Sequence, residues 1–334
     1  MKKFKRWIVH QQFACLRKCS YDSNADGGAI IRVNGKPIHF ARVTIIALYG
    51  DHPACVKSTI TGSSCPFCYV TADSFGDVDA ICRRRTEDSM RVKKMGILAR
   101  ISAAVPGDVS RARKEAQKEG INLDIRNGWL SHPDVPSCFG PDPDLDNVWS
   151  NSPSLMLHAM DEGFVEKFCA VTVKWTIHDA EACGQTRMQS IRWIDAAFAK
   201  THNERPLNSN VEVNDRDCFQ LFPHGVCGYL LDKRRLNAKW YGPLVDQLQM
   251  CLMSAELLTQ RHKREMSDLA HMIRQIHYMV RQPIRRDGID AYQEYLDTFI
   301  RKLIEYTKFH TPSACNSIKF PCARHWGEHR RQLG

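Results

Sequence analysis

Two cysteines have the spacing of a metal-binding knuckle. Cys65 and Cys68 enclose a Pro-Phe dipeptide, and two thiolates at this C-x2-C spacing can bind one Zn²⁺ from a tight turn. A tetrahedral site needs two more ligands, and the candidates are Cys55, Cys82, His52 and His158. A redox disulfide is the alternative, although the motif does not open the helix of an evident βαβ unit. The spacing therefore predicts a structural zinc site to which Cys65 and Cys68 contribute.

Asp51 is a candidate for a different metal chemistry. It follows residues 42–49, a continuous and largely β-branched run that predicts a strand buried on both faces. A carboxylate at the end of such a strand is held rigidly, as Mg²⁺-dependent phosphoryl transfer requires. The structural alternative is that Asp51 caps a helix that begins at Pro53.

A histidine and a basic cluster each have a functional and a structural interpretation. His158 lies in the apolar segment 155–163, where it can be a ligand or a hydrogen-bonded packing residue. The cluster comprises Lys233, Arg234, Arg235 and Lys239, followed by Trp240 and Tyr241. Cations beside aromatic rings suit phosphate contact with stacking on bases or sugars, and they equally suit a solvated helix face.

The composition is that of a basic globular protein. The 334 residues are 43% hydrophobic and 25% charged, and 47 Lys and Arg against 37 Asp and Glu give a net charge of +10. This surplus favours a polyanionic partner such as nucleic acid. The sequence contains no P-loop, no G-x-G-x-x-G after a strand, no G-x-S-x-G and no H-E-x-x-H. These absences argue against nucleotide-driven motors, dehydrogenases, α/β-hydrolases and zincins.

The cysteines and the N-terminus bear on the compartment. Most of the 14 cysteines are single residues within apolar runs, as expected for buried thiols in a reducing compartment. No window reaches the roughly 20 apolar residues of a membrane helix, and the basic N-terminus lacks the apolar stretch of a secretory signal. We therefore expect a nuclear or cytoplasmic protein, neither secreted nor membrane-bound.

The elements that would position these residues change character along the chain. Residues 7–19 and 108–119 are expected to be helical, and 29–40 to form a hairpin whose Asn34-Gly35 pair suits a type I′ turn. Further on, hydrophobic residues recur at intervals of three and four over 266–280 and 289–306, which predicts a pair of amphipathic helices. Strands early and helices late predict a mixed α/β fold with a large, mostly helical insertion.

Several short motifs follow one another in a specific order. Residues 47–54 read A-L-Y-G-D-H-P-A, 64–70 read S-C-P-F-C-Y-V, 120–130 begin G-I-N, 157–163 read L-H-A-M-D-E-G and 316–320 read N-S-I-K-F. In this order they resemble the ADxPE, CPxC, GI…NPFW, LHQLxxG and HSLKHY motifs of the Plavaka-type DNA transposases, relatives of the KDZ group of eukaryotic cut-and-paste elements. Residues 7–11 are similar to the helix that precedes these motifs, so the resemblance covers nearly the whole chain.

The family implies an RNase H-like fold in which three acidic residues bind two divalent ions, Mg²⁺ or Mn²⁺, and this chain would contain part of its sheet. Asp51 matches the second aspartate, whereas the first would precede Met1 and the glutamate would follow Gly334. Leu155 and Ala54 stand where the family has acidic residues, which indicates a decayed copy or a distant branch. The implied regions are a partial RNase H-like region over 1–80, a connecting region over 81–155, a mixed region over 156–242, a helical insertion over 243–311 and a return segment over 312–334.

Two functions from different classes follow as expectations. The first is a fragment of a cut-and-paste transposase, inactive as given, whose intact relatives cleave and join DNA. Its partner would be the double-stranded DNA of transposon ends, bound by the basic cluster, and the chain would form a homo-oligomer. The alternative is a non-enzymatic, zinc-stabilised module that binds DNA or protein and was domesticated from such an element.

The charge surplus generates a test of DNA binding. If about six or more phosphates are contacted, duplex affinity should fall by about 10³-fold or more between 50 and 200 mM salt, because condensed counterions are released. Replacing Arg234 and Arg235 by Glu should weaken binding to every sequence alike. Titration of labelled duplexes at several salt concentrations measures both effects. Affinity that does not depend on salt, or no binding at low salt, would contradict the nucleic-acid interpretation.

Overall fold

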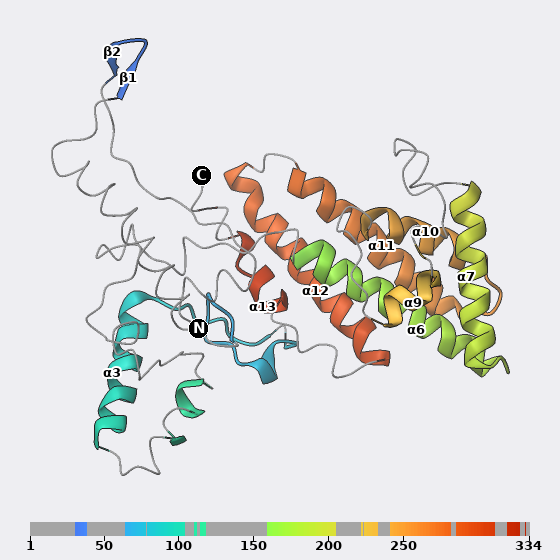
Figure 1. Cartoon of the computed structure of the whole chain (residues 1–334), viewed down its shortest axis with the longest axis horizontal. Coiled ribbons are helices and arrows are strands. Elements are labelled where there is room, and N and C mark those ends of the chain that lie inside the picture. Colours follow the sequence, from blue (N-terminus) through green and yellow to red (C-terminus); the bar gives the residue numbers. More distant parts are fainter. Residues whose placement is uncertain are drawn as a thin grey trace. The chain divides into compact units, whose positions relative to one another are not determined.

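A computed structural model describes residues 31–38, 64–77, 79–103, 110–111, 114–117, 159–204, 222, 224–232, 241–281, 285–310, 319–327 and 331 (Figure 1). The chain divides into two compact units, one formed by Met1–Leu155 with His325–Gly334 and the other by Met156–Arg324. The first contains the cysteine knuckle, and the second is a helical domain. Among the described residues, no helix is both long and apolar enough to cross a bilayer.

The helical domain, Met156–Arg324, is assembled around one enclosed helix. Its elements are η3, a π-helical segment (Met160–Val165), α6 (Glu166–Ala182), α7 (Arg187–Glu204), α9 (Gly225–Leu231), α10 (Tyr241–Met253), α11 (Gln260–Arg281), the 3-10 turn η6 (Arg286–Gly288), α12 (Ile289–His310) and α13 (Lys319–Ala323). Helix α6 contacts η3, α7, α9, α10 and α12, and its buried residues lie on several faces. A helix that is apolar on most sides is stable only when neighbours cover it, so α6 forms the centre of this domain.

The two amphipathic helices that the sequence predicts are present as α11 and α12, which contact each other. Helix α11 ends at Arg281, before Pro283, and α12 ends at His310, before Pro312. All six residues of the second predicted stripe are buried, from Ile289 to Tyr306. Proline lacks an amide hydrogen and restricts the residue before it, which explains why both helices end where they do.

The core of the helical domain contains a buried chain of polar side chains. Thr172 Oγ1 lies 2.9 Å from Tyr306 Oη, which lies 3.3 Å from His262 Nε2. His262 Nδ1 is 3.2 Å from Asp179 Oδ2, and the Thr259 amide donates to the same oxygen at 3.2 Å. Burial raises the pKa of Tyr306, so its hydroxyl stays protonated and can donate to His262. Each buried polar group thereby gains a partner, as burial in an apolar core requires.

The first unit, Met1–Leu155 with His325–Gly334, contains the strands of the described residues. Strands β1 (Ile31–Val33) and β2 (Lys36–Ile38) are antiparallel, with Val33 opposite Lys36. Asn34 and Gly35 have φ of 54° and 78°, the two positive values that a type I′ turn requires. The predicted hairpin is therefore confirmed. The unit also contains the 3-10 turn η1 (Ala72–Ser74) and helix α3 (Glu87–Ala103).

The prediction of an α/β fold with a partial RNase H-like sheet is wrong. The described residues are mostly helical, and the only named strands among them are β1 and β2, which pair with each other. Short apolar runs do not distinguish a buried strand from a buried helix, and most of the described core residues lie in helices. Of the other predicted elements, residues 110–111 and 114–117 are helical, whereas 7–19 and 42–49 lie outside the described residues.

The buried polar chain generates a prediction about stability. Asp179→Ala should lower the free energy of unfolding by roughly 2–3 kcal/mol, because His262 and Thr259 lose their acceptor inside the core. Tyr306→Phe should cost about 1 kcal/mol, the value of an ordinary hydrogen bond. Asp268→Ala is the matched control, since Asp268 pairs with Lys302 at 3.6 Å on the surface and its loss should cost less than about 1 kcal/mol. Urea unfolding measures all three, and equal effects of Asp179→Ala and Asp268→Ala would contradict the role of the buried chain.

Candidate metal centre

The cysteine knuckle is one arm of a short antiparallel ladder. Cys68 forms a bridge with Arg84, the Tyr69 amide donates to the Arg83 carbonyl at 3.0 Å, and the Arg85 amide donates to the Phe67 carbonyl at 2.9 Å. The pairing satisfies backbone groups that would otherwise be buried without partners. It therefore fixes the knuckle against residues 83–85, which follow 14 or more residues later in the chain.

The side chain of Arg85 holds the knuckle from inside. Arg85 is 1% exposed, and its Nε donates to the carbonyl oxygens of Cys65 at 3.1 Å and of Cys68 at 2.9 Å. Its guanidinium also lies over the Tyr69 ring, 4.5 Å from the centroid. A buried cation is stable only when nearby acceptors and π-electrons replace its water. The two carbonyls that Arg85 binds belong to the two cysteines, so this contact sets the shape of the turn that carries both thiols.

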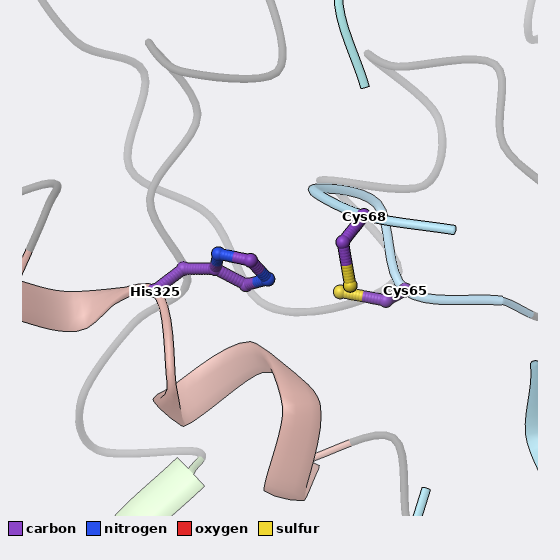
Figure 2. A group of neighbouring side chains, drawn as sticks. All are labelled: Cys65, Cys68 and His325. Carbon is purple, nitrogen blue, oxygen red and sulfur yellow. The ribbon is translucent and has the colours of Figure 1, made fainter. Parts of the chain in front are cut away.

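Three potential metal ligands converge beside this turn. Cys65, Cys68 and His325 are all buried, and one ligand atom from each lies within 4.8 Å of the others. Figure 2 shows the two sulfurs side by side with the His325 ring directed toward them. The Phe67 ring packs edge-on against His325 at a centroid distance of 5.6 Å, which helps to orient the imidazole. Neither cysteine is part of a disulfide in this structure.

The electrostatics of the thiols depend on their neighbours. A hydrogen bond with the Cys65 thiol, together with burial, raises the pKa of Cys68 to about 12, whereas a hydrogen bond with the Cys82 thiol opposes that shift. Burial lowers the pKa of Arg84, and its attraction to Cys68 and Cys65 acts in the other direction. The Arg84 cation therefore lies where negative charge on these two sulfurs would be stabilised. Any metal that binds here has to displace protons from the thiols.

The donor set determines which kind of metal the group could hold. Two sulfurs and an imidazole nitrogen are the ligands of zinc and other soft or borderline metals, whereas Mg²⁺ and Mn²⁺ take oxygen ligands. Within the part of the chain that the structure describes, no other three His, Cys, Asp or Glu side chains bring their ligand atoms equally close together. Cys65, Cys68 and His325 could thus hold a metal ion.

The structure brings together part of the predicted site. Cys65 and Cys68 converge as the spacing predicts, and His325 joins them. Cys82, a predicted candidate for a further ligand, is described and half-buried but is not part of this group. The other predicted residues lie outside the described residues, namely Asp51, His52, Cys55, His158, Lys233, Arg234, Arg235 and Lys239. The Mg²⁺ or Mn²⁺ site at Asp51 and the basic DNA-binding cluster therefore stay predictions.

Sequence reasoning did not select His325 as a ligand. Its distance from the knuckle along the chain offers no spacing that links the two. One signal was available, since Cys322 and His325 are separated by two residues, the same spacing as Cys65 and Cys68. Histidine at such a position is a common zinc ligand, but only the folded chain shows that its ring reaches the thiols.

Comparison with protein-family models, with curated proteins and with solved structures gives no match. The function is therefore inferred from the sequence and structure of this chain alone.

The contact of Arg85 with the knuckle generates a prediction about metal affinity. Arg85→Met should weaken metal binding by about 10–100-fold, the usual effect of removing a group that orients metal ligands. Arg83→Met is the matched control, because Arg83 is exposed and meets the knuckle only through its backbone carbonyl. Competition with a chelator of known affinity measures both variants. Equal affinity of the two would show that the Arg85 side chain does not support the site.

Proposed function

We propose that this chain is a zinc-stabilised module that binds nucleic acid, with Cys65, Cys68 and His325 as ligands of a structural Zn²⁺. The observation that carries the proposal is the convergence of three buried ligand atoms within 4.8 Å of one another. Thiolate and imidazole ligands in a buried, braced turn are the features of a site that stabilises a fold.

Zinc is the metal that the donor set favours. It binds Cys sulfur and His nitrogen in tetrahedral geometry, and it brings no redox chemistry that would oxidise the thiols. Zinc also replaces hydrophobic burial as a source of stability where a unit has few regular elements. The described residues that adjoin the knuckle along the chain form turns, the Cys68–Arg84 bridge, the 3-10 turn η1 and helix α3, and a bound zinc would link them to the segment at His325.

Nucleic acid is the partner that the charge favours. The net charge is +10, and residues 83–100 contain seven Arg or Lys against two Asp or Glu. Arg83 and Arg100 are exposed, whereas Arg85 is buried in the support of the knuckle and is not available for phosphate. The motif order that resembles DNA transposases also supports a DNA partner, and a nuclear location would follow from it.

The motif order favours descent from a transposase as a second proposal. On this proposal Asp51 once formed part of a metal-dependent DNA-cleaving site, and the present chain retains the knuckle and the surplus of basic residues. The zinc-stabilised module is preferred, because its ligands are side chains that lie together in the described residues.

The proposal predicts the metal content of the purified protein. Full-length protein from metal-supplemented medium should contain about one zinc per chain, and Cys65→Ser should lose it, because a serine hydroxyl is a poor zinc ligand. The matched control is Cys183→Ser, which removes an exposed thiol outside the group and should retain zinc. Elemental analysis by mass spectrometry measures the content.

A second measurement separates the metal from the partner. Chelation should make residues 64–85 more sensitive to proteolysis, since structural zinc stabilises the fold around it. The zinc-loaded protein should bind duplex DNA with the salt dependence given above. Absence of zinc from the wild-type protein would contradict the metal centre, and absence of DNA binding by zinc-loaded protein would contradict the partner.

A further inference from the structure

Three ligands leave one position of a tetrahedral metal open. We propose that Cys82 occupies this position, so that Cys65, Cys68, Cys82 and His325 form a closed Cys3His zinc site. The inference rests on the proposed zinc site and completes its ligand set.

The first support is the contact between thiols. The Cys68 thiol interacts with the thiols of both Cys65 and Cys82, and both contacts affect its pKa. Two thiolates on one tetrahedral zinc, each at about 2.3 Å from the metal, are about 3.8 Å apart. Cys82 is not part of the group whose ligand atoms lie within 4.8 Å of one another, so its side chain has to rotate toward the other thiols to share a metal with them.

The second support is the backbone around Cys82. The Arg83 amide donates to the Ile81 carbonyl at 3.0 Å, which makes Cys82 the central residue of a three-residue turn. Ile81 is 90% exposed and Arg83 is exposed, whereas Cys82 between them is half-buried. The ladder that pairs Cys68 with Arg84 holds this turn beside the knuckle. Cys82 is therefore more buried than its two neighbours, and it lies on the segment that the ladder holds beside the knuckle.

The third support is charge. Three thiolates and a neutral imidazole around Zn²⁺ leave one surplus negative charge, which is costly in a buried site unless a cation is near. Arg84 is half-buried and interacts electrostatically with Cys68 and Cys65. Its guanidinium is in place to offset this charge.

The fourth ligand decides what the metal can do. A zinc with three protein ligands keeps a position for water or substrate, as in catalytic sites, whereas four protein ligands leave none. With Cys82 bound, the metal joins the knuckle, the turn at Cys82 and the segment at His325, which are distant in sequence. The centre would then stabilise the unit and perform no chemistry.

X-ray absorption spectroscopy at the zinc edge tests the inference on unmodified, full-length protein. We expect three sulfur ligands at about 2.3 Å and one nitrogen at about 2.0–2.1 Å. Two sulfurs with two nitrogen or oxygen ligands would overturn the assignment of Cys82 and leave the proposed zinc site intact. A wild-type chain that binds no zinc would overturn both.

Variants identify which cysteine supplies the third sulfur. Cys82→Ser should lose one sulfur and weaken zinc binding by more than about 100-fold, since changes outside the ligand sphere already cost about 10–100-fold. Cys82→His should keep zinc with two sulfurs and two nitrogens. Cys183→Ser should keep all three sulfurs. Three sulfurs in Cys82→Ser, or loss of one in Cys322→Ser, would overturn the inference.

Discussion

The buried guanidinium of Arg85 is the contact on which the metal centre depends. Its Nε donates to the carbonyl oxygens of Cys65 and Cys68 at 3.1 and 2.9 Å, and its backbone amide donates to Phe67 at 2.9 Å. One residue thus holds the turn by both its side chain and its backbone. A buried cation loses its hydration and needs protein acceptors in its place, so the turn and the guanidinium stabilise each other. The two thiols that converge with His325 lie on this turn.

In the helical domain, too, buried polar groups need hydrogen-bond partners. Its central helix α6 carries Thr172 and Asp179 into the core, where Tyr306 and His262 from α12 and α11 satisfy them. The Trp175 ring stacks on His262 at a centroid distance of 4.4 Å and with an interplanar angle of 6°. Polar residues inside a packed core fix which helices lie together, because each can be satisfied by only one arrangement of neighbours. The domain is therefore specified by directional contacts as well as by hydrophobic burial.

The cysteine turn and the arginines beside it indicate which kind of metal site this chain could form. Cys65, Cys68 and His325 could hold a metal ion, and the turn that carries the two cysteines is buried and supported by Arg85. Sulfur and imidazole donors in such a setting are typical of stabilising zinc sites. The basic residues divide into two kinds: Arg85 has a structural role, and Arg83 remains exposed. The three consecutive arginines, Arg83 to Arg85, therefore differ in burial and in contacts, which the sequence alone does not show.

The sequence determined what depends on neighbours along the chain. Asn34-Gly35 specified the hairpin, the apolar period and the prolines specified α11 and α12, and the C-x2-C spacing specified two of the three potential metal ligands, because each is a local property of the backbone. Only the tertiary structure decided that the described part is mainly helical, since α6 is buried on several sides and lacks a one-sided apolar period. It also decided that His325 meets Cys65 and Cys68, because that encounter depends on how distant segments pack and no spacing encodes it.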